Sequence, residues 1–273
     1  MMSQTRVRVP DLERMKRRGE KITMLTAYDA TMARLLDRAG LDAILIGDSL
    51  GMVVQGEDTT LGVTMDAVVH HARAVSRGTT RALVVADMPF LSYQINGDEA
   101  VRNAGRLIQV GGAAAVKLEG GVAVAGVVRR IVDVGIPVFG HLGVMPQSVH
   151  QMGGYLRRGD SPEERDAMIA DAAALERAGA SALVLESIPH DLARTITTRL
   201  RIPTIGIGAG PDCDGQVLVG YDMLGLFDRV PPFVKQYAQL GDAVVKAVSE
   251  YVDDVRAGRY AASPVPAGTA SDT

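Results

Sequence analysis

Residues 82–120 read ALVVADMPFLSYQINGDEAVRNAGRLIQVGGAAAVKLEG and contain one full strand–helix–strand repeat. The runs that begin at Ala82 and at Ala114 are short and almost wholly apolar, which is typical of strands buried on both faces of a parallel sheet. Between them, residues 99–110 place apolar side chains three and four positions apart, as an amphipathic helix does. The stretch therefore predicts two parallel strands joined by a helix.

The same alternation recurs from Lys21 to about Gly225. We expect eight strands, beginning at Ile22, Ala43, Ala82, Ala114, Pro137, Ala182, Pro203 and Gln216. We expect helices at residues 30–39, 65–76, 99–110, 124–134, 164–178 and 192–200, with glycines ending several of them at Gly40, Gly78, Gly111, Gly135 and Gly179. Eight such repeats are typical of a closed (β/α)₈ TIM barrel. A doubly wound open sheet is the alternative, but it usually carries a glycine-rich nucleotide turn after its first strand, where this chain has TAYDAT.

The two ends of the chain extend the barrel. Residues 10–18 predict an N-terminal capping helix, and the amphipathic segment 233–255 predicts a closing helix with an extension. We expect residues 1–260 to form one barrel domain. Residues 261–273 are small and polar, so a disordered tail is expected there.

Composition and charge exclude several classes of protein. The 29 Lys and Arg against 32 Asp and Glu give a net charge of −3, and the chain has no Trp, so nothing points to nucleic acid. Cysteine occurs once, at Cys213, which excludes an intrachain disulfide and a thiolate metal cluster and favours a reducing, cytoplasmic location. No apolar run approaches the ~20 residues that cross a bilayer. Residues 1–21 have no apolar core and do not form a secretory signal.

Polar side chains stand where the expected strands end. From the second strand to the sixth, the set is Asp48, Ser49, Asp87, Lys117, Glu119, His141, Glu186 and Ser187. In barrels of this class the chemistry lies at the carboxyl ends of the strands. Lys117 and Glu119 are two positions apart on one strand, so both side chains point to the same face, which we expect to be the barrel mouth.

The acids of this set outnumber its one lysine. Two carboxylates ~4 Å apart repel each other by roughly 4 kcal/mol at an effective dielectric near 20, so either some of them are protonated or a cation is bound. Oxygen ligands without cysteine favour Mg²⁺ over zinc. A single acid after a strand is commonly a helix N-cap or an ion-pair partner, but four acids after successive apolar runs favour a functional site.

Two further features leave alternatives open. His141 fits a hydrogen-bonded core histidine as well as a catalytic one. The connection over residues 145–162 has the length of a lid, with glycines at Gly153, Gly154 and Gly159 as hinge positions.

Six strings carry a resemblance to a known family: MLTAYD at Met24, GDSLGMVVQGEDTT at Gly47, VADMPF at Val85, VKLEGG at Val116, GHLGVMPQSV at Gly140 and IPTIGIGAGPDCDGQVLV at Ile202. Together, in this order and over about Pro10 to Tyr260, the chain resembles the ketopantoate (3-methyl-2-oxobutanoate) hydroxymethyltransferase family. The resemblance implies a (β/α)₈ barrel. The chain departs from the family pattern at Gly62, at Tyr221 and around LRRGDSPEE. None of these positions is an expected metal ligand or catalytic base.

The resemblance also implies an activity and a set of roles. A hydroxymethyl group would pass from the co-substrate 5,10-methylenetetrahydrofolate to 3-methyl-2-oxobutanoate through a Mg-stabilised enolate, giving 2-dehydropantoate in pantothenate and coenzyme A biosynthesis. The family forms large homo-oligomers, which suggests a decamer. The implied ligands of Mg²⁺ are Asp48, Asp87 and Glu119, the implied substrate-binding residues are Asp48, Ser49, Asp87 and Lys117, and the implied proton acceptor is Glu186.

Three other functions remain open from the sequence. The first is a Mg²⁺-dependent carbon–carbon lyase of the phosphoenolpyruvate mutase and isocitrate lyase type, although this chain has no KKCGH-like string. The second is an aldolase that forms a Schiff base at Lys117. The third is an inactive barrel that serves as a binding protein. The acids at the expected strand ends are all present, which argues against this function.

Overall fold

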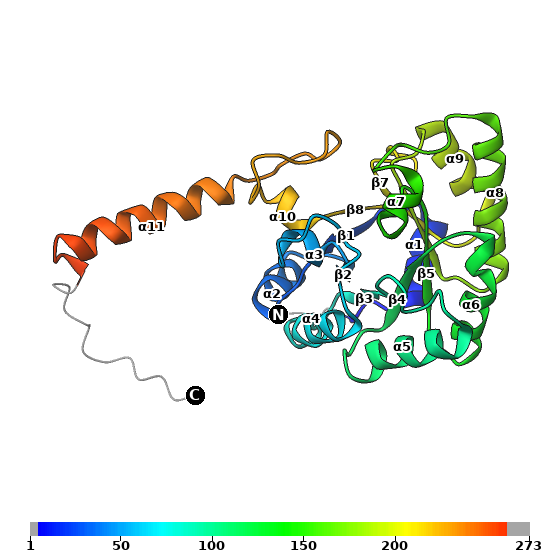
Figure 1. Ribbon diagram of the computed structural model, residues 1–273, viewed down its shortest axis with the longest axis horizontal. Coiled ribbons are helices and arrows are strands. Elements are labelled where there is room, and N and C mark those ends of the chain that lie inside the picture. The colour runs from blue at the N-terminus through cyan, green and yellow to red at the C-terminus, as the bar shows by residue number, and fades with distance from the viewer. Residues whose placement is uncertain (1–4, 261–273) are drawn as a thin grey trace. The chain divides into compact units, whose positions relative to one another are not determined.

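Eight parallel strands pair in sequence order and close into a barrel through β1 and β8, in a computed structural model that describes residues 5–260 (Figure 1). The strands are β1 (Ile22–Thr26), β2 (Ala43–Ile46), β3 (Leu83–Asp87), β4 (Ala115–Glu119), β5 (Val138–Gly143), β6 (Ala182–Glu186), β7 (Thr204–Ile207) and β8 (Gly215–Leu218). The predicted (β/α)₈ barrel is confirmed, and each expected strand is present.

Helices surround the strands, as Figure 1 shows. They are α1 (Val9–Arg18), α2 (Ala30–Arg38), α3 (Leu50–Val53), α4 (Met65–Gly78), α5 (Gly97–Gln109), α6 (Val122–Asp133), α7 (Val149–Met152), α8 (Pro162–Arg177) and α9 (His190–Arg199), with a 3₁₀ turn η1 (Pro146–Ser148) before α7. The N-terminal capping helix is confirmed as α1. The connection that we expected to be a long lid is thus partly helical, since η1 and α7 lie within it.

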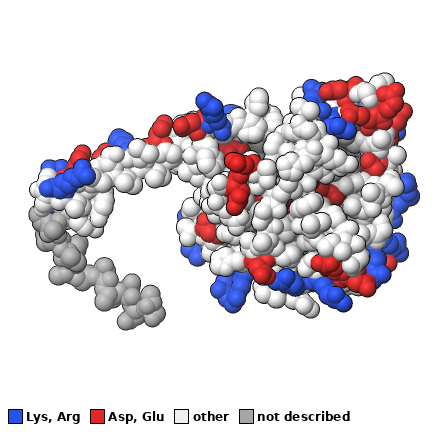
Figure 2. Space-filling model, in the orientation of Figure 1, with Lys and Arg blue, Asp and Glu red and all other residues white. Residues whose placement is uncertain are grey.

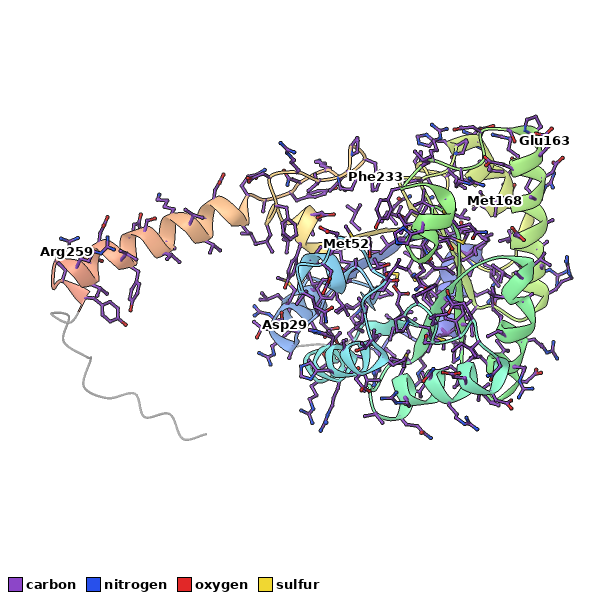
Figure 3. The ribbon with its side chains drawn as sticks, viewed as in Figure 1. Asp29, Met52, Glu163, Met168, Phe233 and Arg259 are labelled. Atoms are coloured by element: carbon purple, nitrogen blue, oxygen red, sulfur yellow. The ribbon has the colours of Figure 1, made fainter. Side chains whose placement is uncertain are left out.

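The local sequence explains where these helices begin and end. Asp29, labelled in Figure 3, caps α2 because its side chain accepts hydrogen bonds from the backbone of Thr31 and Met32. Gly40 has φ of 90° and ends this helix in the left-handed region, as expected. Gly78 is also the last residue of its helix, α4, as expected, but it is not left-handed, and a Cβ there would stand 2.3 Å from the carbonyl oxygen of Ala30. Its small size therefore permits α4 to approach α2 closely.

The chain divides into two compact units at Gly220, and the barrel lies in the first. The second contains α11 (Leu240–Arg256), after the short α10 (Gly220–Met223) at the boundary. The helix that we expected from residue 233 begins only at Leu240, because the N–H groups of Tyr237 and Leu240 bond to carbonyls of residues 223 and 224 instead of continuing a helix. The expectation of one domain over 1–260 stays a prediction, and the expected tail, 261–273, lies outside the described residues.

Alternate residues of each strand point into the barrel. Leu83 and Val85 of β3 and Phe139 of β5 belong to the packed interior cluster, and all three are buried. Because side chains alternate along a strand, the next inward positions toward the carboxyl ends are Asp87 and His141. The interior therefore changes from apolar to charged within one step of two residues at one end of the barrel.

Buried acids also lie at the opposite, amino end of the barrel, where they accept hydrogen bonds from the segments that lead into the strands. Asp37 at the end of α2 accepts from the backbone N–H groups of Thr80, Arg81 and Ala82, just before β3. Asp42 accepts from both the backbone N–H and the hydroxyl of Thr23, at 3.0 and 2.8 Å. These contacts fix the starts of β1, β2 and β3 relative to one another.

Charges on the outer surface are mixed. On the face of the barrel unit in Figure 2, Lys and Arg are interspersed with Asp and Glu around the edge. None of the helices in the described range 5–260 is both long and apolar enough to span a membrane.

Candidate active site

The strand register brings the expected site residues into one layer at the carboxyl end of the barrel. Asp87 of β3 is the direct neighbour of Lys117 of β4, and Glu119 of β4 is the direct neighbour of His141 of β5. Glu186 ends β6, the next strand round the barrel. The predicted common face of Lys117 and Glu119 is thus found, and it is the face that lines the barrel mouth.

Asp87 and Lys117 form a buried ion pair, with Lys117 Nζ 2.7 Å from Asp87 Oδ1. Burial alone would lower the pKa of Lys117, but the charges of Asp87, Glu119 and Asp48 outweigh it and raise that pKa. The ammonium group therefore stays protonated at neutral pH. It provides a fixed positive charge at the floor of the site.

Asp48 follows β2 and is 4% exposed. Its backbone N–H donates to Asp87 Oδ2 at 3.0 Å, which places the two acids side by side. Burial, with the charges of Asp87 and Glu119, raises the pKa of Asp48 to about 8. A carboxyl group whose ionised form is so disfavoured gains strongly from a cation placed beside it.

His141 lies between two carboxylates. Its Nδ1 is 3.4 Å from Glu119 Oε1 and its Nε2 is 3.2 Å from Glu186 Oε2. Burial and the nearby Lys117 oppose the charged form of His141, but the two carboxylates outweigh them and raise its pKa to about 9. Of the two alternatives that the sequence left open, the geometry favours a histidine that belongs to the site.

Ser49 lies at the edge of the same cup. Its hydroxyl is 2.8 Å from the hydroxyl of Tyr28, which follows β1 and is fully buried. The structure therefore brings together Asp48, Ser49, Asp87, Lys117, Glu119, His141 and Glu186, the strand-end set apart from Ser187.

Sequence reasoning missed two buried residues of this site. Gln147 of η1 bonds to Asp48 and Glu119, and Tyr93, between β3 and α5, has its hydroxyl 2.8 Å from Gln147 Oε1. Neither residue ends a strand or carries a charge at neutral pH. The sequence did offer one signal for these two residues. Each is a polar side chain in a short, mostly apolar stretch that follows a strand: Gln147 in MPQSV and Tyr93 in MPFLSY.

The segment after β5 crosses the mouth of the barrel. Further along this segment, the Tyr155 hydroxyl lies 3.8 Å from the sulfur of Met52. Met52 is on α3 and is labelled in Figure 3. This contact joins the segment after β5 to the segment after β2. Burial, with the charges of Asp48, Glu186 and Glu119, raises the pKa of Tyr155. Gly153 and Gly154 precede it with φ of 74° and 128°, a conformation that glycine adopts without strain; their role as hinges stays a prediction.

The chemistry of the donors fits a hard cation, although within residues 5–260 no group of three or more His, Cys, Asp or Glu side chains is preassembled to hold one. Asp87 is paired with Lys117, at 2.7 Å. Glu119 Oε1 is buried and has no hydrogen-bond partner among these residues. Magnesium binds through only one or two carboxylates together with waters and substrate oxygens, so it does not require a ready-made cage.

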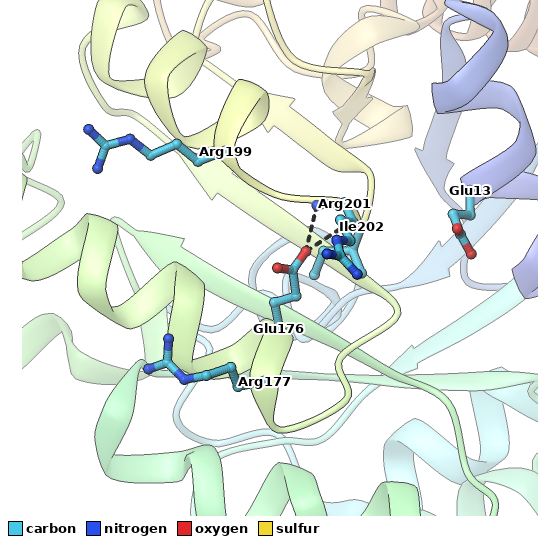
Figure 4. Close-up of a pocket in the computed structure, with 6 residues that line it drawn as sticks. All are labelled: Glu13, Glu176, Arg177, Arg199, Arg201 and Ile202. Atoms are coloured by element: carbon cyan, nitrogen blue, oxygen red, sulfur yellow. Dashed lines mark hydrogen bonds between the residues drawn. The ribbon is translucent and has the colours of Figure 1, made fainter.

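A second feature lies at the amino end of the strands, away from this layer. Figure 4 shows a surface pocket lined by Glu13, Glu176, Arg177, Arg199, Arg201 and Ile202. Glu176 Oε1 accepts from the backbone N–H groups of Arg201 and Ile202 at 2.6 and 3.1 Å. These bonds join the end of α8 to the start of β7, which is a structural role.

The family model and the curated relatives that match this chain agree with one another. Residues 6–263 match the family model described as ketopantoate hydroxymethyltransferase. A 3-methyl-2-oxobutanoate hydroxymethyltransferase from Moorella thermoacetica is 60% identical over 95% of this chain and 97% of its own length. One from Pelobacter propionicus is 53% identical over 93% of this chain and 95% of its own length. Among solved structures, 2,3-dimethylmalate lyase of the PEP mutase/isocitrate lyase superfamily shares the fold, with a TM-score of 0.61 at 20% identity over 97% of this chain and 91% of its own.

Proposed function

Because the chain belongs to the ketopantoate hydroxymethyltransferase family, we propose that it transfers a hydroxymethyl group from 5,10-methylenetetrahydrofolate to 3-methyl-2-oxobutanoate, giving 2-dehydropantoate. The observation that carries this proposal is the buried layer in which Lys117 meets the acids at the ends of neighbouring strands. Such a layer offers a positive charge for an oxo acid and a carboxylate base within one cup. The reaction would serve pantothenate and coenzyme A biosynthesis.

We assign a Mg²⁺ ion to Asp48, Asp87 and Glu119. Support comes from their all-oxygen donor set, from their burial and from the raised pKa of Asp48. When bound, Mg²⁺ would polarise the keto carbonyl of the substrate and thereby acidify the proton on C3. The protein supplies the negative charge that holds the ion and the closed surroundings that exclude other ligands.

Lys117 and Ser49 are proposed to hold the oxo acid, beside Asp48 and Asp87. The Lys117 ammonium is held protonated by its neighbours and lies at the floor of the cup, where it would pair with the carboxylate of the substrate or with the oxygen that gains charge. The Ser49 hydroxyl, fixed by Tyr28 at 2.8 Å, would donate or accept one further hydrogen bond. Both groups favour the enolate because they are in place before charge develops.

Glu186 is proposed to remove the C3 proton. Its side chain is 19% exposed, so it is open to the cup while the neighbouring acids are not. The C3–H bond breaks toward a Glu186 oxygen and its electron pair forms the enolate, whose C3 then bonds to the one-carbon unit. The two bonds from that carbon to the folate nitrogens break, and water supplies the hydroxyl oxygen. Tetrahydrofolate leaves with one proton from water and the one that Glu186 took from C3. Protonated His141, 3.2 Å from Glu186 Oε2, would hold this carboxylate in position.

A cytoplasmic homo-oligomer, a decamer by family resemblance, is the assembly we propose. Helix α11 supports it: Val244, Val248, Tyr251 and Val255 form a stripe along one side and are each 48–55% exposed. Spacings of three and four place these side chains on one helix face. An apolar face of this length suits burial against another copy of the chain.

The test follows the C3 proton of 3-methyl-2-oxobutanoate by NMR in D₂O with the full-length enzyme, Mg²⁺ and tetrahydrofolate, with and without EDTA. We expect loss of the C3 signal that EDTA abolishes. Exchange reports proton removal from this oxo acid alone, before the one-carbon donor is needed. Adding the methylene donor should then convert the exchanged substrate to 2-dehydropantoate.

Three results would contradict the proposal. Oxo-acid binding without exchange would favour a carbon–carbon lyase, the activity named for the solved 2,3-dimethylmalate lyase that shares this fold. Absence of any binding would favour an inactive barrel. Borohydride trapping of a substrate adduct at Lys117 would instead establish the Schiff-base route.

A further inference from the structure

We propose that Gln147 is a positioning residue of the cation site, one that turns Asp48 and Glu119 so that each keeps one oxygen for the ion; this rests on the Mg²⁺ assignment above. Gln147 is 4% exposed and lies in η1, after β5. Its backbone N–H donates to Glu119 Oε2 at 3.0 Å, and its side-chain Nε2 donates to Asp48 Oδ2 at 2.8 Å. A single residue thus holds one oxygen of each carboxylate.

The remaining hydrogen bonds of Gln147 fix the direction of its carboxamide. Nε2 also donates to the Met88 carbonyl at 3.0 Å, while Oε1 accepts from the Tyr93 hydroxyl at 2.8 Å and from Gln94 Nε2 at 3.2 Å. Both N–H groups and both acceptor positions of the amide are therefore used. A flipped amide would place Oε1 against the Asp48 carboxylate and the Met88 carbonyl, so only one orientation is favourable.

The uncharged nature of Gln147 matters for the ion. Lys117 already neutralises Asp87, at 2.7 Å. His141 already faces Glu119 and Glu186, at 3.4 and 3.2 Å, so a further cation at position 147 would leave Asp48 and Glu119 with little of the negative charge that attracts Mg²⁺. An amide instead orients these two carboxylates and leaves their charge in place. Glu119 Oε1, which Gln147 does not contact, is buried and makes no hydrogen bond among the described residues, although His141 Nδ1 stands 3.4 Å from it.

Gln147 also joins elements that are far apart in the sequence. Its side chain lies after β5, yet it bonds to Asp48 after β2 and to Met88 after β3, across the mouth of the barrel. Without this side chain, Asp48 Oδ2 and the Met88 carbonyl would each lose a donor, and Asp48 could rotate. Groups that orient metal ligands in this way typically change metal affinity about 10–100-fold when removed.

The test measures binding of Mn²⁺, an EPR-visible substitute for Mg²⁺, to the full-length protein without substrate. Wild type is compared with Gln147→Met, which keeps side-chain length and the backbone bond to Glu119 but removes the amide. Gln151→Met on α7 is the matched control, because Gln151 is exposed on the same crossing segment. We expect Gln147→Met to raise the Kd for Mn²⁺ about 10–100-fold and Gln151→Met to leave it within about twofold.

A merely structural role would lower the melting temperature of Gln147→Met and leave the Kd of the folded protein unchanged, and that result would overturn the proposal. Should Gln147→Met not fold, Tyr93→Phe is measured instead. This variant removes the hydroxyl that orients Gln147 Oε1 and should raise the Kd about two- to tenfold, the range of one hydrogen bond; an unchanged Kd would again overturn it. If wild type itself binds no Mn²⁺, the Mg²⁺ assignment is wrong, and the proposed role of Gln147 is wrong with it. The proposed activity is judged separately, by the C3 exchange test.

Discussion

Replacing Asp37 should destabilise the barrel far more than replacing an exposed acid, because Asp37 accepts hydrogen bonds from three consecutive residues. Asp37 Oδ1 accepts from the Ala82 N–H at 2.7 Å and the Arg81 N–H at 3.1 Å, while Oδ2 accepts from the Thr80 N–H at 3.0 Å and its hydroxyl at 2.7 Å. The Ala82 N–H is fully buried, whereas Thr80 is exposed.

The size of the effect follows from which donors water can reach in the Asp37→Ala variant. The buried Ala82 N–H loses its only acceptor among these groups and cannot reach water. Loss of a hydrogen bond to a charged acceptor lowers the free energy of unfolding by about 2–3 kcal/mol. Arg81 and Thr80 recover part of their bonding from water and add about 1–2 kcal/mol together. The sum of about 3–5 kcal/mol should lower the melting temperature by roughly 6–20 °C for a domain of this size.

The pH dependence of this effect has a definite sign. Burial would raise the pKa of Asp37, but the hydrogen bonds from Ala82, Thr80 and Arg81 outweigh it and lower that pKa below its ordinary value. The stabilisation is therefore fully present above the carboxyl pKa of the unfolded chain, about 4, and is lost as pH falls through the lower folded value. The stability gap between wild type and Asp37→Asn should be constant near neutral pH and should shrink below about pH 4.

The assay is thermal unfolding followed by circular dichroism, at one protein concentration, from pH 3 to pH 7. Asp133→Asn is the matched control, since Asp133 is also the acid at the end of a helix but is exposed and pairs with Arg129 on the same helix. We expect this control to change stability by less than about 1 kcal/mol. The reasoning is refuted if Asp37→Ala behaves like the control, or if the gap between wild type and Asp37→Asn is the same at pH 3 as at pH 7.

Three further predictions concern the site. Glu186→Gln should retain Mg²⁺-dependent oxo-acid binding but slow C3 exchange about 10²–10⁴-fold, the usual contribution of a general base; exchange at the wild-type rate would exclude Glu186 as the base. Asp48→Ala and Asp87→Ala should each weaken Mg²⁺-dependent oxo-acid binding at least about tenfold in calorimetry, and unchanged affinity would count against them as ligands. Gly143→Ala should both destabilise the barrel and slow C3 exchange, because Gly143 has φ of 102° and a Cβ there would stand 2.1 Å from the Glu186 carbonyl oxygen. A stable variant with a normal exchange rate would contradict this and would show that the ends of β5 and β6 can move apart without loss of stability or activity.

The sequence was sufficient for the barrel because each strand is recognisable on its own. Runs such as ALVVAD are too short for helices and too apolar for surface loops, and their number and spacing select the closed fold. Period two then placed Lys117 and Glu119 on one face without any structure. The start of α11 could not be read in this way, because the backbone of residues 237–241 pairs with residues 223–225, a contact that no helical period reveals.

The site could be predicted only as a set of residues. That Asp87 pairs with Lys117 while Glu119 faces His141 depends on the register between strands, which the sequence of one strand does not contain. Gln147 was missed for a related reason. Its importance comes from a bond to Asp48, 99 positions away, and an uncharged residue in a loop gives no local sign of such a contact.

Buried acids at the two ends of the barrel show why burial alone does not identify a catalytic carboxylate. Asp37 and Asp42, at the amino end, accept hydrogen bonds from nearby backbone N–H groups, so their charge is compensated by the fold itself. At the carboxyl end, burial and the neighbouring acids instead raise the pKa of Asp48 to about 8. Local donors therefore give the first pair a structural role, whereas Asp48, in the second set, gains from a further positive charge beside it. Because the carboxyl end combines these acids with the proposed base, Glu186, whose side chain is 19% exposed, the chemistry is expected there and not at the amino end.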